Sequence, residues 1–153
     1  MSTHHPTTPV VRPRLPRATL GTRLAEWLEE GVAAHPAPAD EAAATAVVLV
    51  PEYLRVCPRS VLADLADRDW TGTVVALVGY GGRTRGRFAI EDAREVLEAA
   101  GAVVLATSLG LDAARIHTEG ADRADVLLRD LLLADLRTAA RTSRTPARPT
   151  PPG

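Results

Sequence analysis

Three runs of apolar and β-branched residues, each followed by a segment with helical periodicity, limit this chain to one class of fold. The runs cover residues 46–50, 73–78 and 102–106. Strands that are apolar at nearly every position are buried on both faces, which is typical of parallel sheets covered by crossover helices. The sequence therefore predicts an α/β fold, a three-layer sandwich with a reduced parallel sheet of about three strands.

Amphipathic segments alternate with these runs and predict the covering helices. Apolar residues recur at helical spacing in segments that begin near residues 19, 61, 89 and 121. Gly101 is expected to end the third helix, because glycine readily takes the positive φ of a helix terminus. The last segment, residues 121–136, carries leucine on more than one face, so we expect it to pack on a core or on a partner.

The two ends of the chain differ in composition from its centre. Eight of the twelve prolines lie there, and such segments do not pack regularly. We expect a flexible N-terminal tail at residues 1–17, one domain at 18–140 and a disordered Pro/Arg-rich tail at 141–153. His4 and His5 in the first tail lack the further ligands that a metal site needs.

Composition also excludes several functions. The net charge of −1 gives no basic surface for nucleic acid, and no apolar run approaches the roughly 20 residues that span a membrane. The N-terminus does not have the pattern of a signal peptide, so we expect a cytoplasmic protein. All 18 basic residues are arginine, which excludes mechanisms that require a lysine, such as a P-loop.

The single cysteine, Cys57, has no partner for an internal disulfide. A catalytic thiolate needs a nearby base, and no histidine lies close to Cys57 in sequence. We therefore interpret Cys57 as a small buried side chain.

Both tyrosines directly follow an apolar run. Tyr53 stands in "PEYL" and Tyr80 in "GYGGRTRG". Parallel sheets bind ligands at the carboxyl ends of their strands, where glycines let backbone amides approach a flat or anionic ligand and tyrosines offer ring faces and hydroxyls. An ordinary turn at Gly81 and Gly82, with Tyr53 at the edge of the core, explains the same pattern equally well.

These stretches resemble a known family, the NADPH-dependent FMN reductases, which have a flavodoxin-like fold. The similar segments are "PEYLRVCPRSVLADLAD" and "VALVGYGGRTRGRFAIEDAREVLEAAGAVVL", and "TRLAEWLEEGVAAHP" is similar to the first helix of the family. The resemblance covers residues 46–111 well and the closing helix loosely.

The resemblance implies that FMN is bound by two loops, with NADPH or NADH as the hydride donor. The implied cofactor-binding residues are Pro51, Glu52, Tyr53, Leu54, Tyr80, Gly81, Gly82 and Arg83. FMN would itself carry hydride from the nicotinamide to an acceptor, so no catalytic side chain is required. The alternative is a non-catalytic, degenerate flavodoxin-like protein that acts as an oligomerisation or regulatory partner.

The chain departs from the family pattern at the flavin. Leu54 replaces the asparagine of the family turn, and no Gly-Ser-x-Arg-x-x-Ser loop is present to hold the FMN phosphate. A substitute phosphate site is conceivable from residues at the start of the first helix, namely Arg12, Arg14, Arg17, Thr19 and Thr22.

The chain also departs from the family in its strands. Val10 and Val11, between two prolines, are too short a run for a central strand, and residues 35–45 leave no room for the family's second strand. A missing first strand would expose the edge of residues 47–50. We therefore expect an obligate oligomer, with a second copy or a related protein, unless the sequence is a fragment that begins too late.

Overall fold

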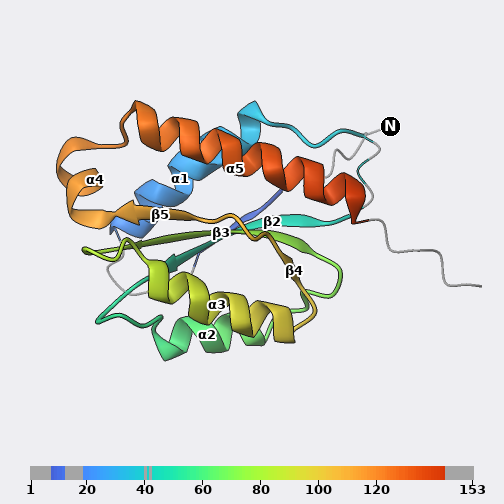
Figure 1. The fold of residues 1–153 in the computed structure, drawn as a ribbon, viewed down its shortest axis with the longest axis horizontal. Helices are drawn as coiled ribbons and strands as arrows, with labels where there is room; N and C mark the ends of the chain where they lie inside the picture. The colour runs from blue at the N-terminus through green and yellow to red at the C-terminus, as the bar shows by residue number, and fades with distance from the viewer. Residues whose placement is uncertain (1–7, 13–18, 40, 42, 144–153) are drawn as a thin grey trace, which may run out of the picture.

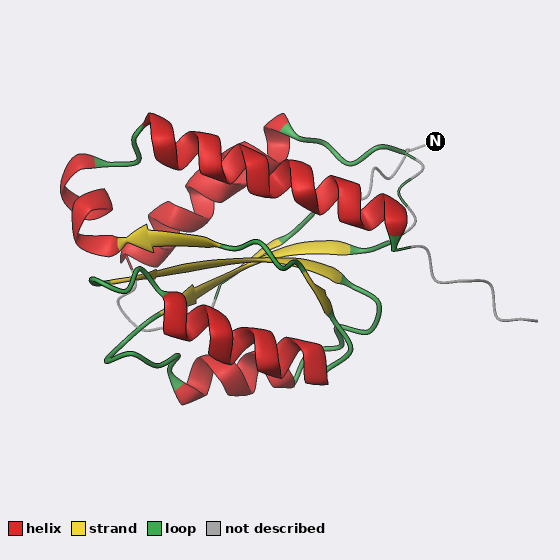
Figure 2. Ribbon diagram, in the orientation of Figure 1, coloured by secondary structure: helices red, strands yellow, loops and turns green. Residues whose placement is uncertain are grey.

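The computed structural model describes residues 8–12, 19–39, 41 and 43–143, and these residues form three layers (Figure 1). Helices cover both faces of a central sheet, as Figure 2 shows by colour. One face carries α1 (Thr19–Ala34), α4 (Ala113–Glu119) and α5 (Arg123–Thr142). The other face carries α2 (Arg59–Ala66) and α3 (Arg87–Ala99). The predicted α/β sandwich is confirmed.

Over the part of the chain that the structure describes, the sheet has five strands, so the expectation of about three is wrong. The strands are β1 (Val10–Val11), β2 (Thr45–Pro51), β3 (Val74–Gly81), β4 (Val103–Val104) and β5 (Leu109–Asp112). Every pair is parallel, in the order β1, β2, β3, and both β4 and β5 pair with β3. The sheet is therefore four positions wide, with its last position split.

Strand β1 corrects the prediction that the first strand is missing. Val10 and Val11 pair with Val47 and Val48, and the Val47 N–H donates to the Pro9 carbonyl at 3.0 Å. The edge that we expected to be open at Val47 and Val48 is thus covered by the chain itself. The structure also places part of the predicted N-terminal tail in the sheet.

Side chains, rather than length, hold β1 in place. Arg137 of α5 donates to the Thr8 hydroxyl at 2.8 Å and to the Glu41 carboxylate at 3.0 Å. Thr8 and Thr45 share a hydrogen bond of 2.6 Å between their hydroxyls. This network fastens Thr8, two residues before β1, to the start of β2 and to α5, so two residues suffice for a strand.

The last position of the sheet also differs from the prediction of one strand at residues 102–106. Arg94 donates to the carbonyls of Leu105 and Ala106, at 2.7 and 3.5 Å, and the chain leaves the ladder there. It returns as β5, which includes Gly110 and gave no β signal in the sequence. The helix α4 was missed because its seven residues are too few for a clear helical period.

The two faces of the sheet carry separate apolar clusters, as expected for strands buried on both sides. Alternate residues of β2 and β3 point to α1 and α5 on one side and to α2 and α3 on the other.

Within the described residues, no helix is both long and apolar enough to span a bilayer. The predicted helix end at Gly101 is confirmed, with φ 92° and its N–H bound to the Glu98 carbonyl.

Helix α5 is the closing helix that the leucine pattern predicted. Its inner face packs in the core through Leu132, Leu133 and Leu136. Arg129 lies 4.9 Å from the Trp27 ring centroid and donates to the Trp27 carbonyl at 3.0 Å. Residues 141 and 142, which the sequence assigned to the C-terminal tail, belong to α5, since the helix extends to Thr142; residues 144–153 lie outside the described residues.

Candidate functional site

The helices that follow β1 and β2 leave on opposite faces of the sheet. Helix α1 packs in the same apolar cluster as α5, whereas α2 packs with α3 on the other face. In open α/β sheets, ligands bind outside the carboxyl ends of neighbouring parallel strands whose helices diverge in this way, and we refer to this region, next to β1 and β2, as the crevice. The crevice places the loop after β2, residues 52–58, at a candidate binding site.

The loop after β2 forms a tight turn with exposed apolar side chains. Tyr53 and Val56 are paired by two backbone hydrogen bonds, of 2.9 and 3.1 Å. The two residues between them have positive φ, 50° for Leu54 and 64° for Arg55. Such values are unfavourable for residues with a β-carbon, and Leu54 is 84% exposed and Tyr53 70% exposed. The loop presents an aromatic ring and a leucine to solvent on a strained turn.

Glu52 ties this loop to the loop after β3. Its N–H donates to the Tyr80 carbonyl at 2.8 Å. Its carboxylate accepts hydrogen bonds from the Thr84 hydroxyl and, at 2.8 Å, from the Phe88 N–H in the first turn of α3. The hydrogen bonds of Glu52 are therefore made within the protein, where it joins the two loops predicted to bind the cofactor.

The structure brings the two predicted loops together through the register of the sheet. Pro51 at the end of β2 pairs with Tyr80 of β3, so both strands end at nearly the same level of the sheet. Tyr80 is half-buried against the core between the sheet and α5, and burial raises the pKa of its hydroxyl. Tyr53 is thus the exposed member of the pair and Tyr80 the packed one, a distinction that their similar sequence context did not reveal.

The glycines of the second loop serve different purposes. A β-carbon on Gly81 would lie 2.9 Å from the Glu52 β-carbon, and one on Gly86, where φ is 78°, would lie 2.5 Å from the Tyr80 nitrogen. These two glycines allow the loop to pack on itself. A β-carbon on Gly82 would meet nothing within 4 Å, so Gly82, next to the exposed Arg83, borders open space.

Of the residues predicted for a substitute phosphate site near the start of α1, the structure describes Arg12, Thr19 and Thr22. Arg12, directly after β1, donates a hydrogen bond to the Thr22 hydroxyl on α1. This contact holds one guanidinium group near the first turns of the helix that follows β1. Arg14 and Arg17 lie outside the described residues.

Cys57 is buried, with 3% of its surface exposed, as the sequence predicted. Burial and the nearby Asp92 carboxylate raise the pKa of the thiol to about 12, and its backbone N–H donates to Asp92 at 3.0 Å. The thiolate that a nucleophile requires is therefore scarce at neutral pH. Among the described residues no group of His, Cys, Asp or Glu is placed to hold a metal ion; His4 and His5 lie outside them.

The fold matches those of solved flavin proteins. An NADH:FMN oxidoreductase, EMOB, in its apo form superposes with a TM-score of 0.69 at 14% identity, over 87% of this chain and 89% of that one. A short-chain flavodoxin associated with a PDU bacterial microcompartment gives 0.64 at 18% identity, over 88% and 98%. A Fusobacterium nucleatum flavodoxin bound to flavin mononucleotide gives 0.61 at 15% identity, over 87% and 98%.

The chain therefore has a flavodoxin-like fold. No family model matches its sequence, and no curated protein matches it. Identities this low establish the fold alone.

Proposed function

We propose that the protein binds FMN in the crevice at the carboxyl ends of β1 and β2, as a flavin-dependent redox protein of the cytoplasm. The observation that carries this proposal is the exposed ring of Tyr53, presented on a strained turn where α1 and α2 leave on opposite faces. Strained, exposed loop residues are common where a ligand is clamped. The flavodoxin-like neighbours that bind FMN support the choice of ligand.

The residues of the two loops fit a flat ring. Tyr53 offers an aromatic face, and the open space at Gly82 leaves room for a planar group to approach the backbone of the second loop. Glu52 keeps the two loops at a fixed separation. Leu54 supplies an apolar contact in place of a hydrogen bond, so we expect orientation of the ring to depend on the backbone.

FMN, when bound, supplies hydride chemistry, with NADPH or NADH as the donor that we propose. The protein then needs only to bind the flavin, orient it and leave one face accessible. EMOB, an NADH:FMN oxidoreductase with this fold, supports a nicotinamide donor.

A titration of the purified protein with FMN, followed by quenching of flavin fluorescence, tests the proposal. We expect saturable binding, and Tyr53→Ala should weaken it about tenfold through the lost ring contact. Gly82→Val should also weaken binding, because its side chain enters the open space. Leu127→Ala, which shortens an equally exposed apolar side chain on α5, is the control and should leave affinity unchanged.

If FMN fails to bind at high micromolar concentration, the flavin proposal is wrong. If FMN binds but the complex does not oxidise NADPH or NADH, the reductase part is wrong and the redox partner must be sought elsewhere.

The second candidate, association without catalysis, is supported by exposed leucines on α5. Leu127, Leu128 and Leu131 are 60%, 50% and 54% exposed and lie on one side of the helix, which is typical of a contact surface. A second copy of the chain is the simplest occupant, since one helix face pairs with itself about a two-fold axis. Sedimentation should show a dimer that Leu127→Glu with Leu131→Glu disrupts; a wild-type monomer at micromolar concentration contradicts this candidate.

A further inference from the structure

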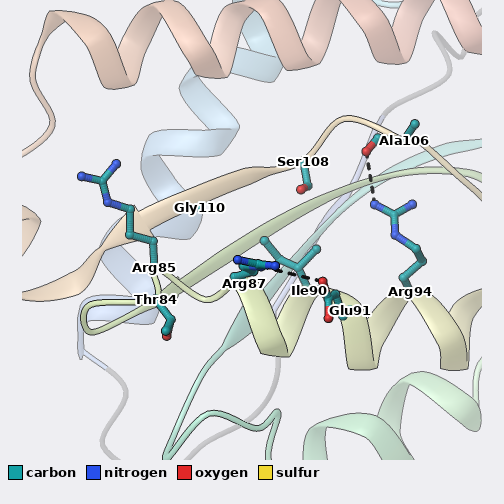
Figure 3. Close-up of a pocket in the computed structure, with 9 residues that line it drawn as sticks. All are labelled: Thr84, Arg85, Arg87, Ile90, Glu91, Arg94, Ala106, Ser108 and Gly110. Atoms are coloured by element: carbon teal, nitrogen blue, oxygen red, sulfur yellow. Dashed lines mark hydrogen bonds and ion pairs between the residues drawn. The ribbon is translucent and has the colours of Figure 1, made fainter.

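A pocket lies beside the loop after β3, next to β5 and thus on the opposite side of β3 from β2 and the Tyr53 turn. It has a volume of about 420 Å³ and lies between α3 and the split last position of the sheet. Figure 3 shows its lining, with α3 below and β5 behind. The pocket is separated from the crevice by the loop at residues 82–86, whose backbone packs on β5: a β-carbon on Gly110 would lie 2.6 Å from the Arg85 carbonyl oxygen.

The pocket carries an excess of positive charge. Its lining includes Arg85, Arg87 and Arg94, against one carboxylate, that of Glu91. The Arg85 side chain points away from the other two (Figure 3), which leaves the guanidinium groups of Arg87 and Arg94. Arg87 and Glu91 are 3.9 Å apart, with side chains that are 76% and 61% exposed. A pair this long and this exposed is weak, so an anion competes readily for the Arg87 guanidinium.

Arg94 is the fixed cation of the pocket. Its side chain is 25% exposed, and its guanidinium is oriented by the carbonyls of Leu105 and Ala106. Its nearest carboxylate, Glu98, lies 4.0 Å away and is half-exposed. Carbonyls orient a guanidinium without cancelling its charge, so Arg94 presents a preorganised positive group at the edge of the sheet.

The rest of the lining is apolar or carries a hydroxyl. Ile90, which is 6% exposed, and the backbone of Gly110 form a surface between the arginines. Ser108 points toward the space between Arg87 and Arg94 (Figure 3). The pocket thus combines two guanidinium groups, a hydroxyl donor and an apolar surface.

We propose that this pocket binds the phosphate groups of a nucleotide. Guanidinium groups pair with phosphate in a bidentate manner, and arginine is favoured over lysine for this task. The volume lies in the range of roughly 300–1,000 Å³ that is usual for small-molecule sites, and exceeds what a single phosphate fills. Ile90 and Gly110 provide the apolar contact for the remainder of the ligand. The site does not require the flavin crevice.

Calorimetric titration of the full chain, without added flavin, with ADP, NADP⁺ and inorganic pyrophosphate tests the proposal. We expect ADP or NADP⁺ to bind at least about tenfold more tightly than pyrophosphate, because only they reach the apolar surface. Binding should weaken as salt rises, since the phosphate contacts are exposed and screened. Equal affinity for pyrophosphate overturns the nucleotide assignment, and no binding of any probe at millimolar concentration overturns the site.

Charge variants with opposite expected signs locate the site. Arg87→Gln should weaken ADP binding about two- to fivefold or more, and Glu91→Gln should tighten it by a similar factor, because it removes the competing carboxylate. Arg59→Gln, an exposed arginine at the start of α2, is the matched control and should change nothing. Neither Arg87 nor Glu91 is buried, so all three variants should unfold at the wild-type temperature.

Amide chemical shifts separate this site from the flavin crevice. Addition of ADP should move the signals of Ser108, Gly110 and the first turns of α3, and leave those of Leu54 and Arg55 in place. FMN titrations should give equal affinities for wild type and Arg87→Gln. Shift changes confined to residues 53–56, or unchanged ADP affinity in both charge variants, would show that the pocket is not the binding site.

Discussion

The two ends of the strands are built in opposite ways. At the amino-terminal end, buried polar groups satisfy one another: Arg137, Glu41, Thr8 and Thr45 form one hydrogen-bonded network. At the carboxyl end, Tyr53, Leu54 and arginine side chains face solvent on turns with positive φ. One end of the strands is therefore held by buried polar groups that pair with one another, while the other keeps strained and exposed groups of the kind found at binding sites.

The largest loss of stability should come from breaking the hydrogen-bonded network at the amino-terminal end of the strands. Arg137→Ala leaves the Glu41 carboxylate, whose side chain is 1% exposed, buried without its cation. Breaking a buried pair from one side costs about 3–5 kcal/mol. We expect this loss in the free energy of unfolding measured with urea, together with release of β1. Arg141→Ala, an exposed arginine on the same helix, should cost less than about 1 kcal/mol; equal losses would contradict the network.

A smaller loss of stability is expected from removing Glu52, which joins the loops after β2 and β3 at the carboxyl end of the strands. Glu52→Ala removes the acceptor of the Thr84 hydroxyl and the Phe88 N–H, which should reduce stability by about 1.5–3 kcal/mol. Glu52→Gln keeps an oxygen acceptor and should lose less. Amide hydrogen exchange should show the loop at residues 81–86 opening in the alanine variant; unchanged protection there would mean that Glu52 does not join the loops.

Relief of strain at the carboxyl end of the strands should stabilise the protein. Leu54 and Arg55 occupy the two central positions of a hairpin turn at positive φ, where Asn-Gly is preferred. The double variant Leu54→Asn, Arg55→Gly should raise the free energy of unfolding by about 1 kcal/mol. Ala63→Gly on the exposed side of α2 is the control and should lower it by about 1 kcal/mol. A loss in the double variant would show that the turn is not strained.

The smallest effect at neutral pH concerns Cys57, the buried side chain beside the exposed turn. Its pKa is raised from 9.0 to about 12, so the folded state favours the protonated thiol. The sign follows: this contribution is fully present below pH 9 and is lost as pH rises toward 12. Cys57→Ala should remove that part of the alkaline slope of stability. At pH 8 the folded protein should resist a disulfide reagent that reacts at once with the unfolded chain; rapid reaction of the folded state would refute the burial.

The sequence predicted the elements that have a strong period. The apolar runs predicted β2, β3 and β4, and the helical spacing predicted α1, α2, α3 and α5, because burial on both faces of a strand or on one face of a helix leaves a regular pattern of apolar residues. The proximity of the two loops that carry Tyr53 and Tyr80 was also predicted, since the carboxyl ends of parallel strands lie at one edge of the sheet. The arginine pocket was missed, because Arg87 and Arg94 lie on a helix face and Ser108 in a loop with no common motif.

What the sequence alone determined is the layered α/β order and the position of the two loops, because these follow from local patterns of apolar residues. Tertiary structure decided the rest. Strand β1 is held in the sheet by the hydrogen bond from Arg137 to Thr8, 129 residues away in sequence. The last sheet position is split where Arg94 donates hydrogen bonds to the carbonyls of Leu105 and Ala106. The sequence likewise did not show that Tyr53 is exposed and Tyr80 packed, because contacts between residues that are distant in the chain leave no periodic pattern in the sequence.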